Sequence, residues 1–416
     1  MLHAAIDFGT SNSAVCLGGQ GQEARLVPLE QDRPTLPTAV FFNADEQHVA
    51  YGRQAVGEYQ AGYGGRLLRS LKSLLGSELM GETTLVNGRP MGYREIIGQF
   101  LGHLKARAED SAGGEIRQAV LGRPVHFVDD NPERDRLAES TLADIARETG
   151  FTEVRFQYEP IAAALGYEAQ LDRETLVLVA DIGGGTSDFS LVRLGPERRA
   201  TIDRSADVLA NTGVHLAGTD FDQQLSLRAA MPALGLGHHG KTGKPVPAQI
   251  YFELATWHKI NFLYAPRELV QAETLRNFYA DERYHARLMK VLREREGHRI
   301  AAAVEDAKVA VAGGGDTALD LGFLEAGLST PVSEDLLRTA TDSAQQRIAA
   351  TALEAVRAAG LKPEQVDALY FTGGSTGLRA LRAAIAAAFP QARTVQGDPF
   401  ASVARGLGVY AERLFR

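Results

Sequence analysis

The chain has 416 residues, of which 44% are hydrophobic and 23% are charged. This length predicts two or three domains, and this composition excludes both a disordered chain and a membrane-embedded one. The net charge of −8 argues against a nucleic-acid-binding protein, because no basic stripe is available to neutralise phosphates. With Cys16 as its only cysteine, the chain can form neither an intrachain disulfide nor a cysteine-rich zinc site.

The N-terminal segment, residues 2–9, reads directly as a strand. It has neither the basic region nor the long apolar run of a signal peptide. No apolar run elsewhere approaches the roughly 20 residues that span a bilayer. We therefore expect a cytoplasmic protein that does not enter a membrane.

Two segments far apart in the chain share one unusual pattern. Residues 4–17, AAIDFGTSNSAVCL, are an apolar run, a polar glycine-containing turn and a second apolar run, which is typical of a hairpin. Residues 176–194, LVLVADIGGGTSDFSLVRL, repeat this order with three glycines and two aspartates in the turn. Two copies of the same hairpin indicate two related lobes.

The region between the two hairpins alternates helices and strands. Apolar spacing predicts helices over 66–76, 94–110 and 131–151, the last with Pro132 in its first turn. A strand is expected over 118–128, interrupted by Gly122 and Pro124, and a short strand before the corner Glu159-Pro160 and an alanine-rich helix. This order predicts an α/β protein.

The second half adds a helical segment and a third glycine turn. Residues 250–311 are rich in helix formers and alternating charges, which favours an inserted helical subdomain with a solvated face. Residues 366–389 read as a strand, the turn TGGSTG and a helix, and residues 400–415 as a closing helix. We predict lobe I at 1–172, closed by a helix at 399–416, and lobe II at 173–398, with a helical insertion at about 223–311.

Glycine turns of this kind can hold phosphate. Without Cβ atoms, several backbone N–H groups can converge on phosphate oxygens. One such nest would comprise Gly183, Gly184, Gly185 and Thr186, and a shorter one Gly9, Thr10, Ser11 and Asn12. An aspartate ends the strand before each nest, and Asp7 and Asp181 can hold Mg²⁺ or its waters beside the phosphates. The pair of hairpins therefore predicts a phosphate clamp between two lobes.

Three further positions fit this clamp. Glu159 lies at a strand-to-helix corner, where a carboxylate can orient an attacking water or simply complement the helix dipole. Lys72 can neutralise a terminal phosphate, although on its own the residue is more typical of a solvated lysine. The turn at 372–377 feeds a helix whose N-terminus can receive a nucleotide.

These segments together resemble the actin-like ATPase superfamily, and within it the ATPase domain of Hsp70 chaperones. The resemblance rests on DFGTSNSAV, DIGGGTSDFSL, YEPIAAALGY, GVHLAGTDFD, VEDAKVAV and YFTGGSTGL, which occur in family order along nearly the whole chain. It implies a two-lobed fold of duplicated ribonuclease H-like lobes with a helical insertion in lobe II. The segment ATWHKINFLY and the enlarged insertion are more similar to short bacterial YegD-like Hsp70 relatives.

The resemblance also implies roles for individual residues. Asp7 and Asp181 would coordinate Mg²⁺ through water, and the two glycine nests would hold the phosphates of ATP or ADP, with K⁺ as an optional further cation. Lys72, Glu159, Asp181 and Thr186 would be catalytic, with Glu159 positioning water and Lys72 the γ-phosphate. Asp188 would lie near the cleft, and Pro124 would match a hinge proline. The implied contacts to adenosine come from Gly218, Glu305, Lys308, Gly373, Gly374 and Ser375.

The sequence departs from the Hsp70 pattern on the adenine side. Gly377 stands where Hsp70s carry an arginine that stacks on adenine, Ala312 replaces a base-contacting serine, and Phe400 replaces an aspartate. We expect no β-sandwich peptide-binding domain, because nothing in the sequence resembles the acidic, leucine-rich linker that precedes it in Hsp70s. Phosphate binding is thus better supported than adenine binding.

We expect a slow Mg²⁺-dependent ATPase that acts as a chaperone-like conformational switch, with an unknown protein client or co-factor and no nucleic acid or membrane partner. Two alternatives remain open. One is a small-molecule kinase of the same superfamily, for which Asp188 and Asp220 are the only nearby candidates for a catalytic base. The other is a filament-forming protein similar to actin or MreB.

Overall fold

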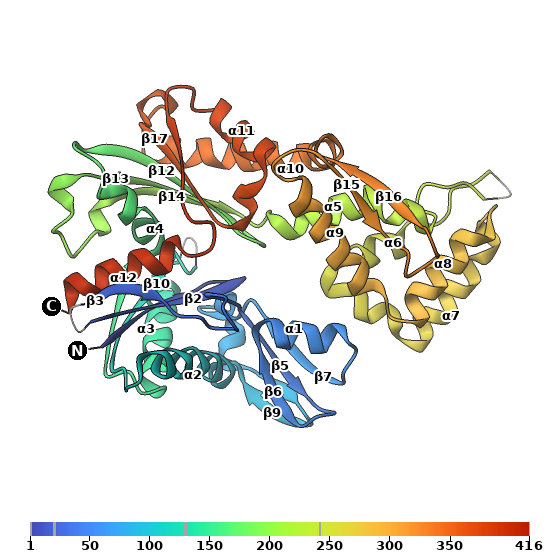
Figure 1. Cartoon of the computed structure of the whole chain (residues 1–416), viewed down its shortest axis with the longest axis horizontal. Coiled ribbons are helices and arrows are strands. Elements are labelled where there is room, and N and C mark those ends of the chain that lie inside the picture. Colours follow the sequence, from blue (N-terminus) through green and yellow to red (C-terminus); the bar gives the residue numbers. More distant parts are fainter. Residues whose placement is uncertain (1, 20–21, 129–130, 241–242, 416) are drawn as a thin grey trace.

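The computed structural model describes residues 2–19, 22–128, 131–240 and 243–415. Two mixed β-sheets dominate the molecule, one below the other in Figure 1. The first sheet has the order β11-β10-β1-β2-β3, with β4 beside β2, and the second has the order β14-β13-β12-β17-β18. In both sheets the first strand of a central hairpin pairs antiparallel with the second strand of that hairpin. On its other edge, the same first strand pairs with a parallel strand, which in turn pairs with a further parallel strand. The repeated topology confirms the predicted α/β fold of two related halves.

The strands of the two hairpins and the strands before Glu159 and before the turn TGGSTG were predicted, whereas β3, β4, β14 and β18 were not, and β10 ends before the predicted position 128. The first sheet contains β1 (His3–Phe8), β2 (Asn12–Gly19), β3 (Gln22–Leu26), β4 (Thr35–Pro37), β10 (Gln118–Arg123) and β11 (Glu153–Tyr158). The second contains β12 (Thr175–Ile182), β13 (Ser187–Leu194), β14 (Val208–Val214), β17 (Ala368–Thr372) and β18 (Arg393–Gln396). Pro124 lies just beyond β10, whereas Gly122 is paired within it and does not interrupt the strand.

Both faces of each sheet are buried. In β1, Ile6 packs into one hydrophobic core and its neighbour Ala5 into another, because successive side chains of a strand point to opposite faces. In β12, Leu178 and Val179 divide between two cores in the same way. The outer face of the first sheet is covered by α2 (Tyr93–Ala112) and α3 (Pro132–Glu148), as predicted from their apolar spacing.

Two helices lie between the sheets. Helix α4 (Glu159–Glu168) follows β11 directly, and α12 (Ser402–Leu414) comes from the far end of the chain (Figure 1). A shared core joins them to Ala5 and Val120 of the first sheet and to Val177 of the second. A Cβ atom at Gly408 of α12 would meet the Sγ atom of Cys16 at 2.7 Å, so the helix packs closely on β2. The two sheets are thus joined through one continuous hydrophobic layer.

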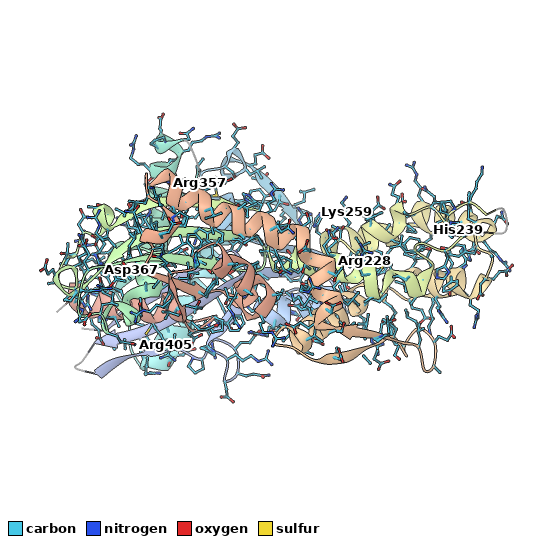
Figure 2. The ribbon with its side chains drawn as sticks, turned by 90° about the horizontal axis from the view of Figure 1, so that it is seen from above. Arg228, His239, Lys259, Arg357, Asp367 and Arg405 are labelled. Atoms are coloured by element: carbon cyan, nitrogen blue, oxygen red, sulfur yellow. The ribbon has the colours of Figure 1, made fainter. Side chains whose placement is uncertain are left out.

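A helical arm extends from the second sheet. It is built from α5 (Gly218–Ala229), α6 (Gln249–Leu254), the 3-10 segment η6 (Trp257–Tyr264), α7 (Pro266–Thr274), α8 (Glu282–Arg293) and α9 (Gly297–Val311). This span overlaps the helical insertion expected at about 223–311. The hairpin β15 (Asp316–Asp320) and β16 (Ser329–Ser333) follows it. Helices α10 (Glu334–Ala358) and α11 (Arg379–Ala387) belong to the second half. Figure 2 shows α10, marked by Arg357, and places His239 at the far tip of the arm.

The predicted helix at 66–76 is wrong. Residues Gly65–Arg69 form strand β7, which pairs antiparallel with β5 (Ala39–Asn43), and only Leu71–Leu74 form a short 3-10 turn, η1. Ser70 between them has φ 55°, a left-handed conformation that ends any helix at this point. The small sheet also contains β6 (His48–Tyr51) and is covered by α1 (Gly52–Gln60); a separate hairpin joins β8 (Thr83–Val86) and β9 (Arg89–Gly92).

Among the helices that the structure describes, none is both long enough and apolar enough to cross a membrane.

Candidate functional site

The two glycine turns face each other. The first connects β1 to β2 at 9–11, and the second connects β12 to β13 at 183–186. A Cβ atom at Gly184 would lie 2.9 Å from the Oγ atom of Ser11, so the two turns approach each other closely at this glycine. The two predicted phosphate-binding turns therefore lie side by side, although 173 positions separate Ser11 from Gly184 (184 minus 11).

Asp7 and Asp181 end the central strands β1 and β12 on either side of the paired turns. Burial raises the pKa of Asp7 well above its usual value, and repulsion from Glu159 and Asp181 raises it further. Burial, together with Asp188 and Glu159, raises the pKa of Asp181 to about 7. Carboxylates that repel one another in this way are stabilised by a cation between them.

The carboxylate oxygens are hard donors of the kind that Mg²⁺ prefers, and Mg²⁺ usually keeps several waters beside one or two carboxylates. Asp7 and Asp181 would together supply two carboxylates. Among the described residues, no three His, Cys, Asp or Glu side chains gather into a metal cage. The donor set thus fits a magnesium ion held through water and phosphate.

Lys72 and Glu159 form an ion pair beside these carboxylates. The Nζ atom of Lys72 donates to Oε1 of Glu159, and only 8% of the lysine side chain is exposed. Lys72 lies in η1 of the first half, and Glu159 is the first residue of α4. A Cβ atom at Gly122 would lie 3.1 Å from Oε1 of Glu159, so this glycine leaves room for the carboxylate. The pair lies close enough to affect the pKa of both Asp7 and Asp181.

The first turn is held by Thr38, a residue that sequence reasoning did not find. Its Oγ1 atom donates to the carbonyl of Gly9 at 2.7 Å, and its backbone N–H donates to the carbonyl of Ser11 at 2.9 Å. Ser13 and Thr38 share a hydrogen bond of 2.9 Å between their hydroxyl groups. Thr38 follows β4 in the chain, and only the pairing of β4 with β2 brings it to the turn.

The second turn is held by the segments that follow it in the second half. Ser375 donates its hydroxyl hydrogen to the carbonyl of Gly183 at 2.6 Å. Thr219 donates to the carbonyl of Gly184 from both its backbone N–H (2.8 Å) and its hydroxyl (2.7 Å). A Cβ atom at Gly218 would lie 2.6 Å from Oγ of Ser375. The predicted adenosine-side residues Gly218 and Ser375 are thus fastened directly to the phosphate-binding turn.

Asp188 is the second residue of β13, just beyond the second turn. Its pKa is raised, mainly because many protein atoms surround the carboxylate, and a hydrogen bond from the Thr186 side chain opposes this shift. The residue is nevertheless exposed to solvent, which screens the charge of its carboxylate. Asp188 therefore lies open beside the turns, as expected.

Lys308 and Glu305 lie on one helix, α9, but differ in their surroundings. The Nζ atom of Lys308 is buried and lies 2.8 Å from Oδ1 of Asp222 and 3.4 Å from the carbonyl of Gly218. Glu305 is exposed. Burial raises the pKa of Asp222 to about 6, although Lys308 opposes the shift. Asp222 belongs to the sequence motif GTDFD, and its negative charge could have identified it as the ion-pair partner of Lys308.

The turn TGGSTG connects β17 to α11 through a short 3-10 segment, η9 (Gly374–Gly377). Gly373 has φ 85°, and a Cβ atom there would lie 2.6 Å from Oδ1 of Asp181. The turn therefore lies against Asp181 as well as the second glycine turn. Gly377 faces open space, with nothing within 4 Å of a Cβ atom built on it. Ala312, after α9, accepts a hydrogen bond from the backbone of Arg379 at 2.9 Å.

A comparison with protein families covers part of this site. Residues 78–230 match the family model described as Hsp70 protein. The matched segment includes Glu159, the second glycine turn and Gly218. The two related sheets, the helices between them and the paired glycine turns form an Hsp70- and actin-like ATPase fold. Over residues 78–230 the chain is therefore similar to Hsp70 proteins.

Proposed function

We propose that the protein is a slow, Mg²⁺-dependent ATPase whose two halves close on ATP as a conformational switch. The observation that carries the proposal is the convergence of both glycine turns and the Lys72–Glu159 ion pair on the carboxylates of Asp7 and Asp181. Each half of the molecule supplies one turn and one aspartate. A triphosphate bound here would therefore contact both halves at once.

The backbone N–H groups of the two turns would orient the phosphates. When bound between Asp7 and Asp181, Mg²⁺ would supply positive charge to the β- and γ-phosphates. Lys72 would add positive charge at the γ-phosphate, and Glu159 would hold a water in line with it. The water oxygen forms a bond to the γ-phosphorus as the bond to the bridging β–γ oxygen breaks. The products are ADP and inorganic phosphate, and the proton of the water leaves with the phosphate or with solvent.

Positioning and charge neutralisation supply most of the rate in phosphoryl transfer. Removal of the Lys72 ammonium group should therefore affect turnover more than binding. We expect Lys72→Ala to lower the single-turnover hydrolysis rate by about a hundredfold, while the affinity for ATP changes only a few-fold. Lys259→Ala, which removes an exposed lysine from η6, is the matched control and should change neither quantity.

The assay should measure phosphate release without any added acceptor, because release under that condition distinguishes an ATPase from a small-molecule kinase. Hydrolysis that persists at the wild-type rate in Lys72→Ala would contradict the proposed role of the ion pair. Absence of phosphate release by the wild-type protein would contradict the ATPase itself.

The proposed chaperone-like role is supported by the Hsp70 family match at 78–230. Such a role requires that the protein bind unfolded chains differently with ATP and with ADP. It can be measured as nucleotide-dependent suppression of aggregation of a denatured model protein. Equal aggregation with ATP, with ADP and without the protein would contradict it.

A further inference from the structure

Phe400 is an exposed aromatic residue on the adenosine side of the site. Its residue surface is 55% exposed, although large apolar side chains usually gain free energy from burial. Its ring lies against the turn TGGSTG, where a Cβ atom at Gly374 would meet the Cε1 atom of Phe400 at 2.8 Å. The close approach of the ring therefore depends on the absence of a side chain at Gly374, and much of the surface of Phe400 remains exposed.

The turn beneath this ring is fixed to the phosphate-binding site. Ser375, the residue after Gly374, donates to the carbonyl of Gly183 at 2.6 Å. Gly374 is therefore one residue away from a direct contact to the second glycine turn, within reach of a nucleotide whose phosphates lie at that turn. Gly374 and Gly377 are both exposed, and nothing lies within 4 Å of a Cβ atom built at Gly377. The surface along the turn is thus free of side chains that would exclude a flat ring.

The backbone that carries Phe400 is held in place. Oδ1 of Asp398 accepts hydrogen bonds from the backbone N–H groups of Phe400 and Ala401, both at 3.0 Å. The carbonyl of Asp398 accepts hydrogen bonds from the hydroxyl groups of Ser402 (2.5 Å) and Thr372 (3.3 Å). The second of these joins the segment to β17, the strand that precedes the turn. An aromatic ring on a fixed backbone can receive a ligand at little cost in conformational entropy.

From this geometry we propose that Phe400 is the base-binding residue of this protein, and that a nucleobase packs against its exposed ring beside Gly374. The ligand class is a nucleoside triphosphate with any aromatic base, because the phenyl ring has no hydrogen-bonding group with which to select one base. Stacking on an aromatic side chain is tolerant of base identity for this reason. The proposal rests on the proposed function, since it requires the phosphates at the paired glycine turns.

Isothermal titration calorimetry with ATP, GTP and inorganic triphosphate, each with Mg²⁺, tests the proposal. Loss of one aromatic stacking contact should weaken ATP and GTP by about tenfold in Phe400→Ala and leave inorganic triphosphate unchanged. Phe400→Tyr keeps a ring at this position and should restore the affinity for both nucleotides. The matched control is Phe262→Ala, which removes a ring that is 72% exposed on η6 and should alter none of the three ligands.

Two results would overturn the assignment of Phe400 while leaving the proposed function intact. One is unchanged ATP affinity in Phe400→Ala. The other is equal weakening of ATP and inorganic triphosphate, which would mean that the ring supports the phosphate-binding turn and not the base. If the wild-type protein binds neither ATP nor GTP, the proposed function fails and this assignment fails with it. Circular dichroism of each variant would confirm that the exposed substitutions leave the fold unchanged.

Discussion

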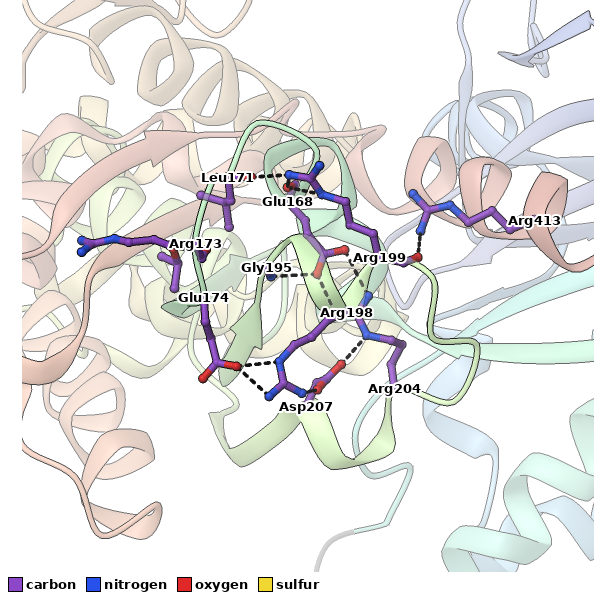
Figure 3. A network of polar contacts seen from close by, with 11 residues as sticks. Glu168, Leu171, Arg173, Glu174, Gly195, Arg198, Arg199, Arg204, Asp207 and Arg413 are labelled. Atoms are coloured by element: carbon purple, nitrogen blue, oxygen red, sulfur yellow. Dashed lines mark hydrogen bonds and ion pairs between the residues drawn. The ribbon is translucent and has the colours of Figure 1, made fainter.

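Among the contacts that join the two halves of the molecule, two differ strongly in their chemistry. One joint, which we call the ionic joint, comprises Glu168, Arg204 and Asp207 (Figure 3). The other, the aromatic joint, comprises Tyr59, Arg69, Trp257 and His298. The ionic joint lies at the end of α4 and the aromatic joint where α1 and β7 meet the helical arm.

The ionic joint is buried and its charges are paired. The side chains of Arg204 and Glu168 are each 1% exposed, and that of Asp207 is 4% exposed. Arg204 donates to both carboxylate oxygens of Glu168, at 2.7 and 3.1 Å, and also to Asp207. Arg199 donates to the carbonyls of Glu168 and Leu171 at the end of α4. Because α4 begins at Glu159, this joint fixes the far end of the helix that carries the proposed water-positioning carboxylate.

The aromatic joint contains less charge and more exposed surface. The guanidinium of Arg69 lies 4.4 Å from the ring centroid of Trp257, whose neighbours are Tyr59 at 5.8 Å and His298 at 5.1 Å. Nε2 of His298 lies 3.0 Å from Oδ1 of Asn261. Burial and the nearby Arg69 lower the pKa of His298 to about 4, so the ring is neutral at pH 7. Tyr59 and Arg69 come from the first half, and the other residues come from the helical arm.

The difference has a physical meaning. Separating a buried ion pair leaves uncompensated charge and costs several kcal/mol. Each aromatic or cation–π contact at a partly exposed site contributes only about 0.5–1.5 kcal/mol. We therefore expect the ionic joint to stay formed as a hinge and the aromatic joint to open and close as nucleotide enters and leaves.

The largest expected effect comes from breaking the ionic joint. Arg204→Met removes the guanidinium and leaves Glu168 buried without its charged partner, although Asp207 keeps its ion pair with Arg198. The substitution should lower the free energy of unfolding by about 3–5 kcal/mol. Urea denaturation followed by circular dichroism measures this loss. Arg283→Met, which removes an exposed ion pair with Asp281, is the control and should have no measurable effect. Equal stability of the two variants would show that the ionic joint is not a fixed hinge.

Breaking the aromatic joint should have a smaller effect on stability and a clear effect on kinetics. Trp257→Ala removes the ring that contacts Arg69, Tyr59 and His298. We expect nucleotide release to accelerate about tenfold, since a loss of about 1.4 kcal/mol in the closed state corresponds to that factor. Stopped-flow displacement of a fluorescent ATP analogue measures the rate. An unchanged release rate would mean that this joint does not restrain opening.

The smallest effect should come from acid. His298 has a folded pKa of about 4, and an imidazole exposed by opening regains a pKa near 6.5. Its stabilising effect on the closed joint is therefore complete above about pH 6.5 and is lost as the pH falls toward 4. Because Trp257 is the only tryptophan, its emission reports this opening directly. We expect a red shift between these pH values in the wild type and none in His298→Gln; the same shift in both would contradict a role for His298.

The sequence was sufficient for the parts of the site that depend on local pattern. The two hairpins, their glycine turns and the aspartates before them were predicted from alternating apolar residues and turn chemistry. Lys72 was a candidate from its residue type, but only the family resemblance favoured it over an ordinary solvated lysine, and its local structure was predicted wrongly. The pattern of 66–76 fits a helix, but pairing of β7 with β5 overrides that local preference.

The joints could not be predicted because they depend on contacts between distant residues. Glu168 and Arg204 are 36 positions apart, and charged residues in a sequence are most often solvated. Tyr59 and His298 are separated by most of the chain and meet only after the helical arm has packed. Likewise, Thr38 reaches Gly9 only because β4 pairs with β2. None of these pairings leaves a periodic signal in the local sequence.

The central claim is that the paired turns and their aspartates form one MgATP site. Calorimetric titration of MgATP into the wild type and Asp181→Ala tests it most directly, with Asp203→Ala as a control that removes an exposed carboxylate. Loss of a group that orients metal-bound water typically costs about 10–100-fold in affinity. We predict a loss of that size in Asp181→Ala and wild-type binding in Asp203→Ala. Unchanged MgATP binding in Asp181→Ala would contradict the account.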